Sequence, residues 1–340
     1  MKRAVVLCPG RGSYAKESLS SLKGITSPAL DVFDAYRSAQ GRPTVREMDS
    51  APGFTSKLHI RGENASALTA GVSLADLDQV DTNAYNIVGV IGNSMGWYTA
   101  LGYAGALSLE ATAELIETMG QYQVGNIVGG QIVYPCVADD WTVDPARVDA
   151  IDSAVAQVPD LFWSIRLGGQ AVLGGTDSAL KRAAEILPEV SMGTHTFPLR
   201  LPLHSAFHTP LMEETAERAR VELAHLPWTA PRIPMIDGLG HVHSPYSASP
   251  ERLRNYTLGP QVTDTFDLTL AIRTALRTWA PDVVILPGPG SNLGSAVAQT
   301  MITERWAEIG SREAFIKRQN DDPILLSMRW PDQRERVVRA

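Results

Sequence analysis

The fold of this chain is decided by residues 86–101, which have the sequence NIVGVI-GNSMG-WYTAL. The apolar run 86–91 predicts a buried strand, and residues 97–101 predict the start of a helix. Between them, Gly92-Asn93-Ser94-Met95-Gly96 has the Gly-x-Ser-x-Gly pattern that is typical of a nucleophile elbow. An elbow places its serine at a helix N-terminus, where free N–H groups favour negative charge. We therefore expect Ser94 to be a nucleophile; the alternative is a glycine-lined turn with an incidental serine.

Length, composition and charge narrow the class of protein. The chain has 340 residues, of which 44% are apolar and 20% charged, as in a globular protein of one large or two ordinary domains. Its net charge of −7 disfavours a nucleic-acid partner, and no apolar run is long enough to predict a membrane span. The two cysteines, Cys8 and Cys136, are too few for a disulfide framework or a zinc site. We expect a cytoplasmic protein without a bound metal.

Apolar patterning predicts an α/β fold with a hydrolase-like core sheet and one inserted subdomain. Core strands are predicted at 4–8, 86–91, 233–236 and 282–286, and helices at 17–40, 66–80, 108–122, 211–226 and 265–279. From residue 131 the order is strand, helix, strand, strand, helix, with a last strand at 195–199, as in a ferredoxin-like βαββαβ unit. We assign residues 1–130 and 201–340 to a large catalytic domain and 131–200 to a ferredoxin-like subdomain. The charged residues 329–340 are predicted to form a surface tail.

A nucleophilic serine needs a general base, and the histidines limit the choice. None of the seven lies beyond residue 243, whereas α/β-hydrolases place their catalytic histidine late in the chain, so the α/β-hydrolase fold itself is disfavoured. His208 is the best candidate, within the sequence SAFHTPLM of residues 205–212. Thr209 can cap the following helix and Pro210 suits its first position, which places His208 at a helix N-terminus. The alternative is a loop histidine that only bonds its neighbours.

Five motifs in this order resemble the acyl-carrier-protein S-acyltransferases, namely the malonyl-CoA transacylases of fatty-acid synthesis and the acyltransferase domains of polyketide synthases. The motifs are the loop PGRGS at 9–13, the nucleophile segment continuing through Tyr98 to Glu110, the strand GQAVLGG at 169–175, AFHTPLM at 206–212, and GPG at 288–290. Together they cover most of the chain. The inserted ferredoxin-like unit agrees with the same family.

The resemblance implies a Ser94–His208 dyad that transfers an acyl group by a ping-pong reaction through an acyl-serine. The backbone N–H groups of Arg11 and Met95 would hold the oxyanion, and a backbone carbonyl, not placed by the sequence, would orient the histidine. The implied substrates are thioesters on CoA or on the phosphopantetheine of an acyl carrier protein, which is the implied partner, with no tightly bound cofactor. An acyl-thioester hydrolase on the same scaffold is the rival hypothesis, and a non-enzymatic docking module is a third.

The departures from the family pattern bear on the substrate. The arginine that clamps the free carboxylate in malonyl-type enzymes is Met119 here, and a thioether cannot pair with a carboxylate. We therefore predict that malonyl is a poor substrate and that the acyl group is monocarboxylic, with aminoacyl and peptidyl groups as candidates. The alternative is that Arg11, which replaces a family glutamine, supplies the clamp. Asn93 and Trp97 flank the nucleophile and are expected to shape the pocket entrance, and Phe207 is expected to line the pocket.

A carrier protein is acidic in this family, so an acidic enzyme needs a local basic surface to bind it. The sequence offers a group of cations near its end, namely Lys317, Arg318, Arg329, Arg334, Arg336 and Arg339. The alternative is that these residues are simply a solvated, charged tail.

Overall fold

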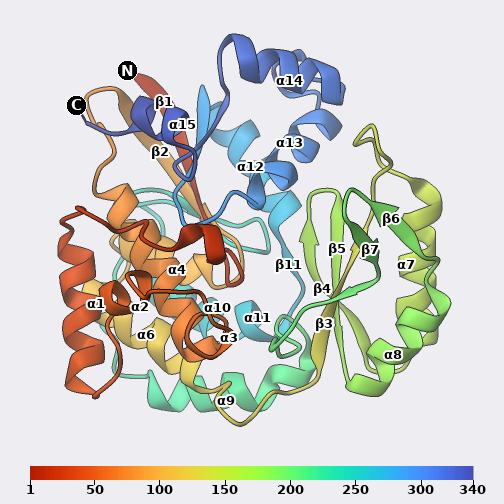
Figure 1. Ribbon diagram of the computed structural model, residues 1–340, viewed down its shortest axis with the longest axis horizontal. Helices are drawn as coiled ribbons and strands as arrows, with labels where there is room; N and C mark the ends of the chain where they lie inside the picture. Colours follow the sequence, from red (N-terminus) through yellow and green to blue (C-terminus); the bar gives the residue numbers. More distant parts are fainter. Residues whose placement is uncertain (340) are drawn as a thin grey trace.

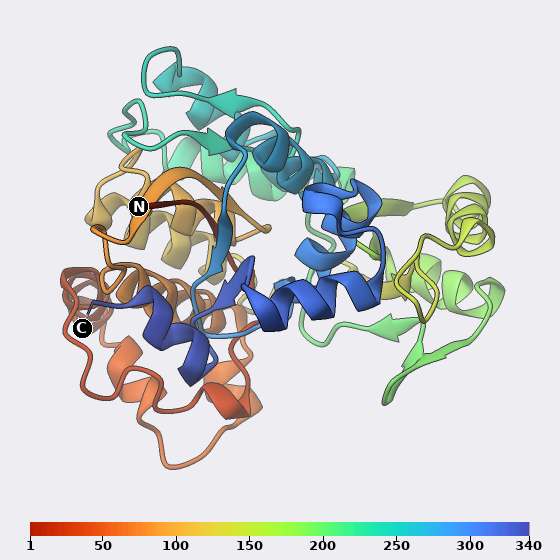
Figure 2. The ribbon, with the colours of Figure 1, turned by 90° about the horizontal axis from the view of Figure 1, so that it is seen from above.

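The computed structural model describes residues 1–339 and shows two lobes side by side (Figures 1 and 2). The larger lobe is built on a six-stranded sheet in the order β10-β9-β2-β1-β12-β13, in which β9 and β10 are antiparallel and the other pairs are parallel. The strands are β1 (Lys2–Cys8), β2 (Tyr85–Gly92), β9 (Met235–Ile236), β10 (Val242–His243), β12 (Val283–Leu286) and β13 (Leu325–Ser327). The mixed α/β class is therefore as the sequence predicts.

Both faces of this sheet are covered by helices. Successive side chains of a strand point to opposite faces, so Val6 and Cys8 pack into one apolar cluster and Val5 and Leu7 into another. The first cluster includes residues of α1 (Pro28–Ala39), α4 (Gly62–Leu77), α5 (Gly96–Tyr103) and α6 (Leu109–Gln121). The second includes residues of α12 (Leu268–Trp279), α13 (Leu293–Thr303) and α14 (Arg312–Asp321). Burial on both faces explains why the strands are continuous apolar runs.

Shorter helices complete the larger lobe. They are α2 (Val45–Asp49), α3 (Ser56–His59), α9 (Glu213–Glu222), α10 (Pro250–Thr257), α11 (Pro260–Thr263) and α15 (Pro331–Val337), with 3₁₀ turns at Lys16–Ser18, Pro210–Met212 and Trp306–Glu308. Among residues 1–339, no helix combines the length and the apolar character that crossing a membrane requires.

The smaller lobe, green in Figure 1, has a five-stranded sheet in the order β11-β4-β5-β3-β8. Its elements are β3 (Gly130–Pro135), α7 (Pro145–Gln157), β4 (Leu161–Leu167), β5 (Gln170–Gly175), α8 (Asp177–Ile186) and β8 (Leu199–Arg200), with β11 (Phe266–Asp267) added from a later part of the chain. Without β11, every neighbouring pair is antiparallel in the strand order of a ferredoxin-like unit. Residues 131–200 therefore do not contain the whole sheet.

The expected last strand at 195–199 is divided in two. β7 (His195–Phe197) pairs with β6 (Val190–Met192) as a separate hairpin, and only β8, after Pro198, joins β3 in the main sheet. Proline has no N–H to donate to a ladder, which explains an interruption at this position.

Two of the predicted helices begin later than expected. Residues 19–27 are not helical, and α1 begins only at Pro28, where the Ser27 side chain accepts a hydrogen bond from the N–H of Leu30. Phe266 and Asp267 form strand β11, and α12 starts after Asp267, whose carboxylate accepts from the N–H of Leu270. In both cases a side-chain cap fixes the start of the helix.

The C-terminal segment is not the surface tail that its charge predicts. It forms α15, in which Val337 is fully buried, and Val338 makes an isolated antiparallel bridge with Val80. Arg334 forms an ion pair with the buried Asp76 of α4. Arg334, one of the cations considered above as a contact for a carrier protein, therefore forms an ion pair within the fold.

Candidate active site

The elbow has the local structure that its sequence predicts. β2 ends at Gly92, α5 begins at Gly96, and Ser94 between them has a φ of 53°. A side chain at Gly92 would overlap the backbone of Gly96, and one at Gly96 would overlap the carbonyl of Cys8. Both positions therefore require glycine, and the turn leaves the hydroxyl of Ser94 free to face a cavity.

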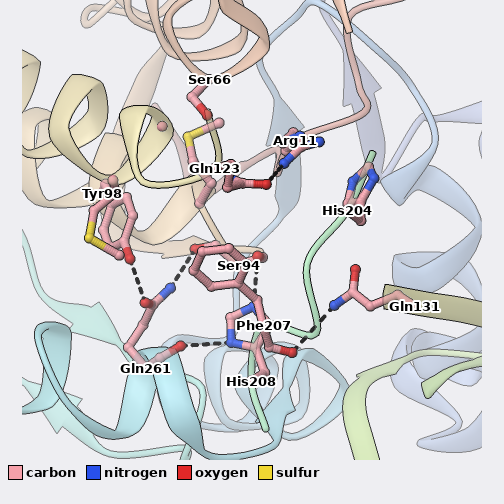
Figure 3. Close-up of a pocket in the computed structure, with 13 residues that line it drawn as sticks. Arg11, Ser66, Ser94, Tyr98, Gln123, Gln131, His204, Phe207, His208 and Gln261 are labelled. Atoms are coloured by element: carbon pink, nitrogen blue, oxygen red, sulfur yellow. Dashed lines mark hydrogen bonds between the residues drawn. The ribbon is translucent and has the colours of Figure 1, made fainter. Parts of the chain in front are cut away.

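The structure brings Ser94 and His208 together across 114 residues of chain (Figure 3). Ser94 Oγ lies 2.7 Å from His208 Nε2, and His208 Nδ1 lies 2.7 Å from the backbone oxygen of Gln261. Because a carbonyl can only accept, Nδ1 carries the proton and Nε2 is the acceptor for the serine hydroxyl. The backbone N–H of His208 also donates to the carbonyl of Val262 at 2.8 Å. Residues 261–262 of the larger lobe thus fix the orientation of the imidazole.

Burial sets the protonation state of the dyad. His208 is enclosed in the protein, and the resulting desolvation lowers the pKa of its imidazole to about 4, against the opposing effect of the Gln261 carbonyl. The imidazole is therefore neutral at pH 7. A neutral Nε2 beside a serine hydroxyl is the arrangement that accepts the proton of an attacking nucleophile.

Two backbone N–H groups next to Ser94 remain available for an oxyanion. Within residues 1–339, neither Arg11 in the loop after β1 nor Met95 at the start of α5 donates its backbone N–H to another residue. Both residues line the cavity that Ser94 faces. They are the two positions at which donors were expected from the sequence.

A partly open cavity lies beside Ser94. Met119 and Phe207 line it, as expected, and Met119 is 4% exposed. Asn93 instead lines a second cavity that also reaches Ser94. Trp97 does not shape an entrance: it is fully buried in the core, and its indole N–H donates to Thr257 Oγ1 at 2.9 Å. The direction of α5 explains this outcome, since the residue directly after the elbow points inward.

Comparison with known proteins shows which proteins this chain is similar to. No family model matches the chain. The chain is 27% identical over 242 residues to the malonyl CoA-acyl carrier protein transacylase of Escherichia coli (strain K12), covering 70% of this chain and 75% of that protein. This chain is thus similar in sequence to a malonyl CoA-acyl carrier protein transacylase over most of its length. The likeness in fold extends over the whole chain. The acyl-carrier-protein S-malonyltransferase of Burkholderia pseudomallei 1710b superimposes with a TM-score of 0.75 at 20% identity, covering 99% of both chains.

A second solved acyltransferase is a malonyl-transacylase in complex with a type II polyketide-synthase acyl-carrier protein. It superimposes with a TM-score of 0.69 at 19% identity, covering 88% of this chain and 93% of that one. At this identity the likeness shows the acyltransferase fold alone, so the chemistry of the present chain has to be argued from its own residues.

Gln261 is the residue of this site that the sequence did not reveal. Its carbonyl is the one that orients His208, and its side chain donates from Nε2 to the carbonyl of Ser94 at 3.0 Å. Tyr98, one turn along α5, donates its hydroxyl to Gln261 Oε1 at 2.7 Å (Figure 3). Gln261 therefore contacts both members of the dyad. No local pattern marks it, because both contacts cross more than fifty residues of chain.

Two more side chains, from the smaller lobe and the segment that follows it, reach the site around Ser94. Gln131 of β3 lines both cavities and donates from Nε2 to Ser164 Oγ at 2.7 Å. His204 lines both cavities as well. Burial, reinforced by the guanidinium of Arg11, lowers the pKa of His204 to about 3, so this second imidazole is also neutral at pH 7. The cavity thus contains one fixed positive charge, that of Arg11.

Proposed function

We propose that this protein is an S-acyltransferase that moves an acyl group from a thioester donor to the thiol of an acyl carrier protein through an acyl-Ser94 intermediate. The observation that carries the proposal is the 2.7 Å contact between Ser94 Oγ and the unprotonated Nε2 of His208, with Nδ1 held by a carbonyl. The relatedness to malonyl CoA-acyl carrier protein transacylases supports the same reaction class and the same partner. CoA or phosphopantetheine would carry the substrates.

The reaction follows from the geometry in two halves. His208 Nε2 takes the proton of Ser94 as Oγ attacks the thioester carbonyl, and the backbone N–H groups of Arg11 and Met95 stabilise the oxyanion. The C–S bond breaks, and the departing thiolate recovers the proton from His208. In the second half, His208 deprotonates the acceptor thiol, which attacks the acyl-serine and returns the hydroxyl. Protons and electron pairs balance without a metal or a redox cofactor.

We propose further that the acyl group is monocarboxylic and that malonyl is a poor substrate. Met119 occupies the cavity wall where a carboxylate clamp would be needed, and it offers no charge. Arg11 also lines this cavity, but two of its nitrogens already donate to Gln123 Oε1 and to the carbonyl of Leu203, and its buried Nε faces no acceptor. Two of its five N–H donors are thus already engaged, so a carboxylate bound at those terminal nitrogens would compete with Gln123 and Leu203. Aminoacyl and peptidyl groups remain candidates within the monocarboxylic class.

The experiment is covalent loading followed by intact-protein mass spectrometry. Wild-type protein and Ser94→Ala are exposed to malonyl, butyryl, aminoacyl and peptidyl thioesters. We expect one acyl mass on the wild type for monocarboxylic donors, none on Ser94→Ala, and weak malonyl loading. Strong malonyl loading would mean that Arg11 acts as the clamp.

A second measurement separates transfer from the rival hydrolase hypothesis. The loaded acyl-enzyme is followed in buffer alone and with a holo acyl carrier protein. Transfer requires slow loss in buffer and rapid loss to the carrier thiol. Equal loss in both conditions would favour hydrolysis instead.

A further inference from the structure

One end of the cavity beside Ser94 is closed by a single charged side chain. Arg11 lies on the side of Ser94 away from His208 and reaches across to Gln123, just beyond the end of α6 (Figure 3). Its other terminal nitrogen donates to the carbonyl of Leu203, in the segment that leads to His208. The guanidinium therefore links the side chain of Gln123 to the backbone at Leu203.

This closure is electrostatically unfavourable. Burial lowers the pKa of Arg11 to about 10, Nε has no hydrogen-bond partner, and both acceptors of the terminal nitrogens are neutral oxygens. The carboxylate of Glu63 attracts the Arg11 guanidinium and partly offsets the lowering of its pKa by burial. Glu63 makes no hydrogen bond to Arg11 and instead pairs with Arg61 at 2.8 Å. An uncompensated buried charge is favoured to move wherever water or a carboxylate is within reach.

A third cavity, called the outer cavity here, is lined by both hydrogen-bond partners of Arg11, although Arg11 itself does not line it. Gln123 lines both cavities, and Leu203, which holds Arg11 through its carbonyl, also lines the outer one. Glu63 is part of the outer wall, so a guanidinium that swung outward would approach its carboxylate. The outer cavity is bordered by aliphatic side chains that face solvent, Ile127 at 45% and Leu203 at 42% exposure. Exposed aliphatic groups at the end of a substrate cavity suit an apolar ligand.

We propose that Arg11 is a gate, and that its displacement joins the two cavities so that the tail of a medium- or long-chain aliphatic acyl group passes between Gln123 and Leu203 and lies against Ile127. In the closed state the cavity holds short acyl groups. In the open state the guanidinium lies near Glu63 and the acyl tail takes the space it leaves. The inference rests on the proposed function, because the acyl group must first be attached at Ser94.

The test compares acylation rates for two chain lengths. Butyryl-pantetheine and dodecanoyl-pantetheine are reacted with the wild type and with Ile127→Asp, and loading of Ser94 is followed by mass spectrometry. Ile127 takes no part in the dyad and lies at the surface, so the substitution leaves the fold and butyryl loading intact. We expect dodecanoyl loading of Ile127→Asp to fall by about tenfold, because a carboxylate at this point removes the burial of a few methylene groups of the tail.

Ile316→Asp is the matched control, since Ile316 on α14 is also 45% exposed and lines neither cavity. It should load both groups like the wild type. The gate is refuted if the wild type accepts butyryl but not dodecanoyl groups, or if Ile127→Asp and Ile316→Asp load dodecanoyl equally. Absence of Ser94 loading by every thioester would instead overturn the proposed acyltransferase function.

Discussion

Removing one hydroxyl, in Tyr98→Phe, tests whether Gln261 aligns the dyad. The hydroxyl is the donor to Gln261 Oε1, at 2.7 Å, and the side chain of Gln261 is 2% exposed. Without it, Oε1 is left buried without a donor, which costs about 1–3 kcal/mol of unfolding free energy. The amide is then free to rotate away from the Ser94 carbonyl, 3.0 Å from Nε2. We expect acylation to slow by on the order of tenfold, because small misplacements of reacting groups are costly.

The assay combines thermal unfolding with single-turnover acylation by a butyryl thioester across a range of concentrations. A positioning effect lowers the limiting rate and leaves the apparent affinity unchanged. Tyr103→Phe is the control, because this tyrosine lies on the same helix and its hydroxyl makes no hydrogen bond within residues 1–339. If the two variants acylate and unfold alike, Gln261 does not act on the dyad through its side chain.

Three further predictions follow from the same contacts. Acylation should be independent of pH above about 6 and should decline as His208 is protonated around its pKa of about 4, because only the neutral imidazole accepts the Ser94 proton; a decline centred near 6.5 would refute the burial effect. Met119→Arg should raise malonyl loading by on the order of tenfold or more and lower butyryl loading, with Met119→Leu as the control in the same mass-spectrometric assay. Glu117→Gln should lower the free energy of unfolding by about 3 kcal/mol, measured by chemical denaturation, because the buried guanidinium of Arg37 then loses the carboxylate that lies 2.8 Å from it. A loss below about 1 kcal/mol would contradict this.

The sequence predicted the parts of the fold that depend on local pattern. The elbow strand and the helix after it were found because apolar periodicity and two obligatory glycines coincide within residues 86–101. The helix at Leu109–Gln121 was found from its cap, Ser108, whose side chain accepts from the N–H of Ala111. These signals lie within a few residues of the element that they specify.

What the sequence missed depends on contacts between distant segments. Charge density predicted a solvated C-terminal tail, but burial of Val337 and the pairing of Arg334 with Asp76 outweigh it. The same holds in the site, where Gln261 is recognisable only once the fold has placed its carbonyl against His208. Trp97 follows the nucleophile in sequence, yet the helix turns it into the core. Neighbours along the chain are poor guides to neighbours in a cavity.

The strand β11 has a practical consequence for anyone wishing to exchange or excise the smaller lobe. Phe266 and Asp267 pair with Ile165 and Arg166 at the outer edge of β4, although residues 201–265 separate them from the end of the insertion. A fragment cut at the insertion points would expose that edge to solvent as a template for pairing with other copies. Chimaeras between acyltransferases should therefore transplant this dipeptide together with the insertion, or expect aggregation.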